Sequence, residues 1–179
     1  MTRPALPAGD LARRYREEFD QAFARARAPA AAALEDLLAL RVGSDPLALR
    51  LSEIESVHAN RTIVPLPSAA PELLGIAGLR NTLASIYDLR VLLGYPAGPP
   101  PRWFALARGA QPVGFAFEQF EGHVRLPRER VLASSGGAPT RRHVAGVVDT
   151  GEPRSILDVA SLLEVIARRA PAEPARGEG

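Results

Sequence analysis

The chain has 179 residues, of which 46% are apolar and 23% charged, a composition typical of a soluble globular protein with one ordinary domain or two small ones. It contains no cysteine, which excludes disulfides and thiolate metal sites. No apolar run approaches the ~20 residues of a membrane span, and the first ten residues lack the apolar stretch of a secretory signal. We therefore expect a cytoplasmic protein.

The basic residues are unusual because all 22 of them are arginine, while the net charge is only +2. Arginine binds phosphate through two parallel hydrogen bonds, so this composition leaves a nucleic-acid-binding protein as the alternative function. The 20 acidic residues are interspersed with the arginines, and no dense basic block occurs. The charge pattern therefore favours a compositional bias toward arginine over a nucleic-acid interface.

The N-terminal segment predicts an amphipathic helix over residues 10–28, with Asp10 as its N-cap and Pro29 just beyond its end. Apolar residues recur every four positions in this helix: Leu11, Tyr15, Phe19 and Phe23. Such a stripe either packs on the protein's own domain or engages a partner helix or groove, and both possibilities stay open.

The rest of the chain predicts mainly strands, separated by turns and proline-rich loops. Residues 95–101, with four prolines and one glycine, are interpreted as a connector between two halves. The predicted strands and strand pairs are residues 37–43, 46–51, 54–59, 76–87, 102–109, 112–120, 121–127 and 144–157. Helical patterns follow Asp88 and Asp158. Residues 133–142 are expected to form a flexible segment, and residues 171–179 are expected to be disordered.

Two of these units repeat each other. Residues 76–93 and 144–163 both read apolar-Ala-Gly-apolar, then a turn, then Ile-apolar-Asp-apolar and a Leu-Leu pair. This alignment pairs Gly78 with Gly146 and indicates two similar β subdomains. The duplicated aspartates, Asp88 and Asp158, are predicted to be helix N-caps rather than a catalytic pair.

Residues that could carry chemistry form no recognisable site. His58, His123 and His143 lack metal-ligand spacing, and Ser134 and Ser135 lack the strand-turn-helix context of a nucleophile. The acidic stretch of residues 118–123 is interpreted as a solvated turn. The sequence thus predicts no enzyme, no cofactor and no metal.

Four aromatic residues are interpreted as core, although a stacking platform for bases is the alternative: Trp103, Phe104, Phe115 and Phe117.

The order of elements and several short motifs resemble the CheW-like family of bacterial chemosensory scaffold proteins. The likeness rests on "GIAGLRN" at residues 75–81, "IYDLRVLLG" at 86–94 and "VAGVVDTGEPRSILDVASLL" at 144–163. It implies two SH3-like five-stranded β-barrels with short capping helices, here with an added N-terminal helix. In domain terms, it implies an extension over residues 1–33, a CheW-like domain over 34–170 and a disordered tail over 171–179.

The resemblance also implies a non-enzymatic adaptor that couples methyl-accepting chemoreceptors to the regulatory domain of a histidine kinase. The arginine of the family's L-R-G motif matches Arg80, and the repeat aligns it with Val148, which suggests that the fold needs no charge there. The partner-binding residues implied by the resemblance are Ile54, Ser56, Leu79, Arg80 and Asn81.

Three departures from the family pattern favour an adaptor with altered partners. Asn81 replaces the motif glycine, Ser85 replaces a common proline, and the glutamate of the family's V-x-E-I strand is aligned with Ser56. The N-terminal extension has no counterpart in a minimal member of the family.

Overall fold

The computed structural model describes residues 33–68, 70–80, 82–96, 98–133 and 143–169. The chain divides into two units, Met1–Ala33 and Leu34–Gly179, and every element below belongs to the second. Several features expected from the sequence lie outside the described residues: the helix over 10–28, Asn81, the flexible segment over 133–142 except for Ala133, and the tail over 171–179.

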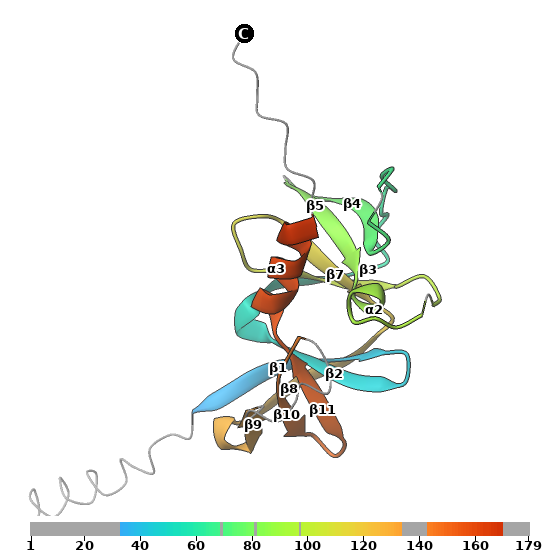
Figure 1. Cartoon of the computed structure of the whole chain (residues 1–179). Coiled ribbons are helices and arrows are strands. Elements are labelled where there is room, and N and C mark those ends of the chain that lie inside the picture. The colour runs from blue at the N-terminus through green and yellow to red at the C-terminus, as the bar shows by residue number, and fades with distance from the viewer. Residues whose placement is uncertain (1–32, 69, 81, 97, 134–142, 170–179) are drawn as a thin grey trace, which may run out of the picture. The chain divides into compact units, whose positions relative to one another are not determined.

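The first sheet has six strands in the order β8-β1-β2-β11-β10-β9 (Figure 1). Neighbouring strands are antiparallel, except that β11 runs parallel to β2. The strands are β1 Leu34–Val42, β2 Asp45–Arg50, β8 Gln119–Pro127, β9 Val131–Ala133, β10 Val144–Asp149 and β11 Pro153–Leu157.

The second sheet has five strands in the order β3-β6-β7-β5-β4, with β5 parallel to β7. Val64, in the loop after β3, exchanges backbone hydrogen bonds of 2.8 and 2.9 Å with Ile76 of the edge strand β4. The strands are β3 Ile54–Ala59, β4 Leu73–Leu79, β5 Thr82–Asp88, β6 Trp103–Ala107 and β7 Val113–Phe117. The described part of the chain also holds four short helices: η1 Leu51–Glu53, α2 Leu89–Leu92, η2 Arg128–Arg130 and α3 Val159–Arg169.

The path of the chain differs from the expected succession of two halves. The chain leaves the first sheet at η1, builds the whole second sheet from β3 to β7, and then returns through β8. The segment over 95–101 therefore joins α2 to β6 within one sheet, and its interpretation as a connector between halves is wrong. The mainly β architecture of two sheets is confirmed, with six strands in one sheet and five in the other.

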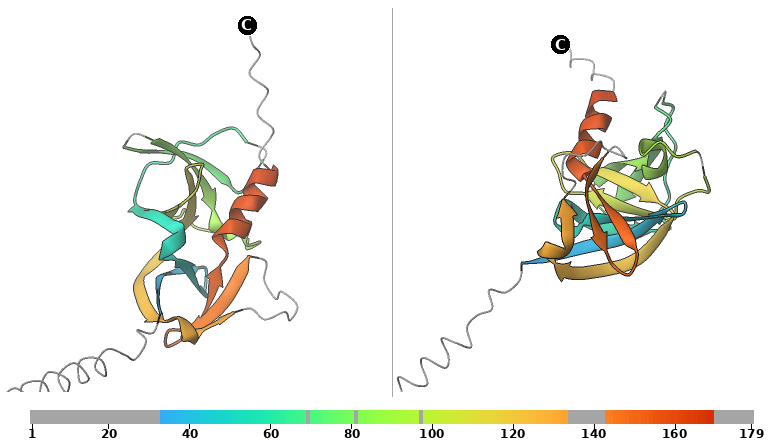
Figure 2. Two further views of the ribbon diagram at one scale, coloured as in Figure 1. Left: turned by 90° about the vertical axis from the view of Figure 1, so that its left-hand side faces the viewer. Right: turned by 60° about the horizontal axis from the view of Figure 1, so that its bottom comes forward.

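Two sheets share an apolar core, and Figure 2 shows them as separate layers with α3 running from one toward the other. β1 is buried on both faces. Leu37 packs in an apolar cluster formed by strands of the first sheet, whereas Leu38 and Leu40 pack in the core that the two sheets share. This is why its sequence reads as a continuous apolar run. Phe115 and Phe117 are at most 1% exposed, so their interpretation as core residues is confirmed.

The repeat is present in the structure as two hairpins, each followed by a helix. Both hairpins, β4–β5 and β10–β11, have a bulge near their start, and each second strand pairs in parallel with a strand from elsewhere. Asp88 accepts a hydrogen bond from the Arg90 N–H (2.9 Å), and Asp158 accepts one from the Ser161 N–H (3.0 Å). Both predicted N-caps are confirmed.

The register of the repeat differs from the sequence alignment by three residues. The bulges equate Gly75, rather than Gly78, with Gly146, because these two glycines pair with Ile86 and Ile156. The counterpart of Arg80 is then Gly151 at the tip of the second hairpin. Val148, which is fully buried in β10, corresponds to the equally buried Ala77, so the comparison of Arg80 with Val148 was wrong.

Candidate partner-binding surface

Arg80 lies at the tip of the β4–β5 hairpin. Leu79 and Thr82 form the last pair of the ladder, so Arg80 lies in a tight two-residue turn. Such turns need positive φ, and Arg80 has a φ of 44°. A left-handed conformation costs a residue with a Cβ about 1–2 kcal/mol unless its side chain can bond locally, as that of Asn can. An exposed arginine is therefore held where glycine or asparagine would be easier to accommodate.

The other residues implied by the resemblance lie at different depths. Leu79 is half-buried against the core of the second sheet, and Ser56 is half-buried on β3. Ile54 is 4% exposed and belongs to the core between the sheets, so it offers almost no surface. Asn81 lies outside the described residues.

His58 connects two of these positions. Its Nε2 lies 2.8 Å from the Ser56 Oγ, and its ring packs 5.0 Å from that of Phe104. Burial lowers the pKa of His58, and the charges of Arg61 and Arg80 lower it further. His58 thus lies beside Ser56 and within electrostatic reach of Arg80, and its lowered pKa keeps it neutral at neutral pH.

Two more arginines, next to the paired ends of β3 and β6, were not singled out by sequence reasoning. Arg61 follows Asn60 in the loop after β3, and the Asn60 N–H donates to the Arg102 carbonyl (2.8 Å) just before β6. Asn60 has a φ of 52°. Nothing in the sequence pairs Arg61 with Arg102, because they come together only when β3 and β6 pair.

The glutamate of the V-x-E-I pattern is present in a different register from the one expected. Residues 51–54 read L-S-E-I, which places the glutamate at Glu53 in η1 rather than at Ser56. One carboxylate oxygen of Glu53 is buried without a hydrogen-bond partner among the described residues. Burial raises the pKa of Glu53, and the neighbouring carboxylates Asp158 and Glu35 add to the rise, although Arg50 opposes it.

An apolar groove lies between α3, β5 and the β6–β7 turn, with a volume of about 580 Å³. Leu83 on its rim is 65% exposed. The other apolar side chains that line it are Tyr87, Ala110, Pro112, Val113, Leu163, Ile166 and Ala167. The groove is a second concave surface at which another chain could bind.

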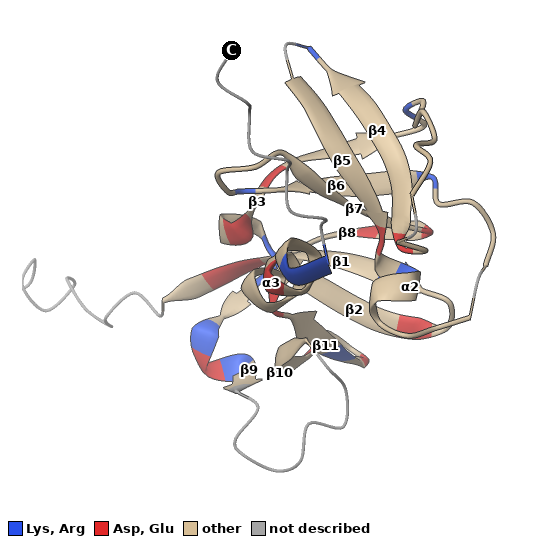
Figure 3. Ribbon diagram, turned by 45° about the horizontal axis from the view of Figure 1, so that its top comes forward, with Lys and Arg blue, Asp and Glu red and all other residues tan. Residues whose placement is uncertain are grey.

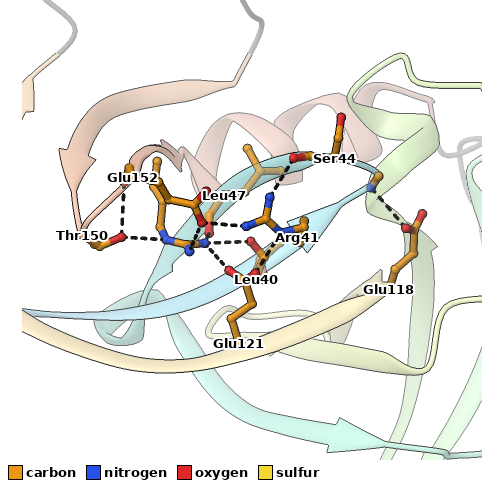
Figure 4. A network of polar contacts seen from close by, with 10 residues as sticks. Leu40, Arg41, Ser44, Leu47, Glu118, Glu121, Thr150 and Glu152 are labelled. Atoms are coloured by element: carbon orange, nitrogen blue, oxygen red, sulfur yellow. Dashed lines mark hydrogen bonds and ion pairs between the residues drawn. The ribbon is translucent and has the colours of Figure 1, made fainter.

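The acidic stretch over 118–123 is not the solvated turn that the sequence suggested. Figure 4 shows Glu121 among the guanidinium groups of a polar network on the first sheet. Its carboxylate lies 2.8 Å from Arg41 and 2.6 Å from Arg154, while Glu118 pairs with Arg90. These ion pairs hold distant strands together, so this part of the expectation was wrong.

Within the described ranges, no group of three or more histidine or acidic side chains could hold a metal ion. Over the same residues, no helix combines the length and the apolar character that a membrane crossing requires. The arrangement presents an exposed cationic hairpin tip and an apolar groove, which are features suited to binding another macromolecule.

Comparison with known proteins defines the class. A sequence model of the CheW-like domain matches residues 36–167, and the chain belongs to this family. The fold is similar to the crystal structure of the scaffolding protein TtCheW from Thermoanaerobacter tengcongensis, with a TM-score of 0.62 and 14% identity over 69% of this chain and 88% of that one. No curated protein matches the chain. None of these matches supports the nucleic-acid alternative.

Proposed function

We propose that the protein is a cytoplasmic, non-enzymatic adaptor that couples methyl-accepting chemoreceptors to the regulatory domain of a histidine kinase. Membership of the CheW-like domain family supports this role. The observation that carries it is the position of Arg80 at an exposed hairpin tip. Its backbone there is left-handed, a conformation that glycine or asparagine adopts at a lower energetic cost. The N-terminal segment would either pack on the adaptor or extend its partner surface.

Arg80 would act as an anchor for the partner. Its guanidinium group can donate several hydrogen bonds in a fixed plane, which suits carboxylates and backbone carbonyls. A rigid two-residue turn presents this group with little loss of freedom on binding. Ser56 and Leu79 would frame the anchor, whereas Ile54 would support β3 from the core.

The test is a quantitative pull-down of the full chain with the kinase regulatory domain and with receptor cytoplasmic helices from the same cell. We expect Arg80→Ala to weaken one of these complexes by about 1–3 kcal/mol, a typical anchor loss. Arg130→Ala is the matched control, because Arg130 is exposed in η2, which joins two strands of the first sheet, whereas the hairpin belongs to the second sheet. Equal binding by both variants and the unmodified chain would remove Arg80 from the interface.

A further inference from the structure

Most described arginines are neutralised by the protein's own carboxylates. The arginines that form such ion pairs are Arg41, Arg50, Arg90, Arg125, Arg128, Arg154, Arg168 and Arg169. They are spread over the first sheet and the helices, and this is how a chain with 22 arginines and 20 acidic residues keeps its surface charge balanced.

Three arginines of the second sheet and its loops are exceptions, as are Arg108 and Arg130 among the described residues. Arg61, Arg80 and Arg102, here called the arginine cluster, are all exposed, and none forms an ion pair with a carboxylate that the structure describes. Figure 3 shows basic but no acidic colour at the free end of the β4–β5 hairpin. The cluster is therefore a patch of positive charge that the described part of the fold leaves uncompensated.

The three side chains come from separate segments but share a neighbourhood. Arg102 is tied to Asn60, the residue before Arg61, by a backbone hydrogen bond of 2.8 Å and a longer side-chain contact of 3.4 Å. Arg61 and Arg80 both act electrostatically on His58. Like charges held close together are unfavourable until an anion binds between them.

We propose that the arginine cluster binds an acidic polypeptide segment of the partner, with glutamate or aspartate side chains bridging Arg61, Arg80 and Arg102. This inference rests on the proposed adaptor function, because it names the chemistry of the partner at the Arg80 surface. Two of the three described non-glycine residues with positive φ, Asn60 and Arg80, lie here. Tight turns therefore fix the backbone at Arg80 and directly before Arg61, which restricts where their guanidinium groups can lie.

Apolar neighbours favour a polypeptide over a nucleic acid. Val64 and Leu66 follow Arg61 in the same loop and are 54% and 42% exposed. The backbone of Val64 pairs with β4, the strand that leads to Arg80. Protein interfaces combine arginine with apolar contacts in this way, whereas a phosphate backbone is bound by extended rows of cations with few apolar contacts.

The experiment measures binding of the full chain to a short helical peptide that has glutamates on one face and leucines beside them. An identical peptide with glutamine for glutamate and a single-stranded oligonucleotide of equal charge are the comparison probes. We expect the glutamate peptide to bind and its affinity to fall as salt rises toward about 150 mM, because the contacts are ionic. The triple variant Arg61→Gln/Arg80→Gln/Arg102→Gln should bind about tenfold more weakly.

The matched control is Arg125→Gln/Arg130→Gln/Arg168→Gln, which removes the same charge from exposed arginines elsewhere. Circular dichroism verifies that both variants are folded. Equal losses in the two triple variants, equal binding of the glutamine peptide, preference for the oligonucleotide, or no binding at all would each overturn the proposal. No kinase or receptor is used, so peptide binding together with a failed pull-down would reject the adaptor function and leave the cluster standing.

Discussion

The two hairpins of the repeat share one framework and use arginine in opposite ways. In β4–β5 the arginine is at the tip, exposed and left-handed; in β10–β11 the tip is Gly151, and the arginine is Arg154, buried at 7% exposure further down the strand. Arg154 contacts Glu121 and Glu152 and donates to the Leu40 carbonyl. The same side chain thus stabilises one hairpin and is available for recognition on the other.

Removing the buried arginine should have the largest effect. Arg154→Ala removes one of the two arginines that Glu121 and Glu152 share, since Arg41 also contacts both, and it removes the hydrogen bond to the Leu40 carbonyl. Losing charge-assisted hydrogen bonds of a buried donor costs about 1–3 kcal/mol. We expect this loss in the free energy of unfolding from urea titration. Arg80→Ala is the matched control on the first hairpin and should change stability by less than about 0.5 kcal/mol. A small effect of Arg154→Ala would mean that the network is not a stabilising element.

Substituting the residue at each hairpin tip should have an intermediate effect on stability. Gly151 has a φ of 103°, so Gly151→Ala should destabilise the protein by about 1–2 kcal/mol. Arg80→Asn should stabilise it by up to about 1 kcal/mol, because asparagine tolerates the left-handed region, while binding to the partner weakens. Thermal unfolding of both variants gives the signs, and a destabilised Arg80→Asn would contradict the argument that Arg80 is strained.

Acid should affect the neighbours of the two hairpin arginines in separate pH windows, which is the smallest expected effect: His58 on β3 lies near Arg80, and Glu121 on β8 binds Arg154. The pKa of His58 is lowered by burial and by Arg61 and Arg80, so the stability it contributes is present above its unfolded value of about 6.5 and is lost as pH falls below it. Burial would raise the pKa of Glu121, but Arg41 and Arg154 outweigh it and lower it. Its contribution is therefore lost only below about pH 4.3.

Urea titrations at several pH values can separate the two windows. His58→Gln should flatten the decline in stability between neutral pH and about pH 5, and Glu121→Gln should flatten the decline at lower pH. Identical profiles for the two variants would show that neither group titrates as its surroundings indicate.

The sequence predicted the strands and caps because their signals are local. Alternation identifies a strand, and the aspartates before apolar helical patterns identify both N-caps. The register of the repeat was missed because Gly75 and Gly78 look alike in sequence. Only the fold distinguishes them, since a side chain on Gly75 would collide with the Val64 backbone whereas Gly78 has open space beside it.

The candidate surface was predicted only as far as its hairpin. Arg80 is part of a motif, but Arg61 and Arg102 lie in loops without a recognisable pattern and meet through strand pairing. The ion pairs of Glu121 were missed for the same reason, since Arg41 is 80 positions away in the chain. Contacts of this kind depend on the crossing of the chain between sheets, for which composition and periodicity carry no signal.

That crossing has a consequence for the order of events during synthesis. All strands of the second sheet lie between residues 54 and 117, so that sheet can close while the ribosome is still translating the rest. The first sheet cannot, because β2 must wait for β11, whose Ser155 pairs with Leu47. Until then, the face of β1 and β2 that carries Leu37 and Ala48 lacks Val148 and Ile156, with which it packs in the folded chain. The nascent chain is most exposed to aggregation in this interval.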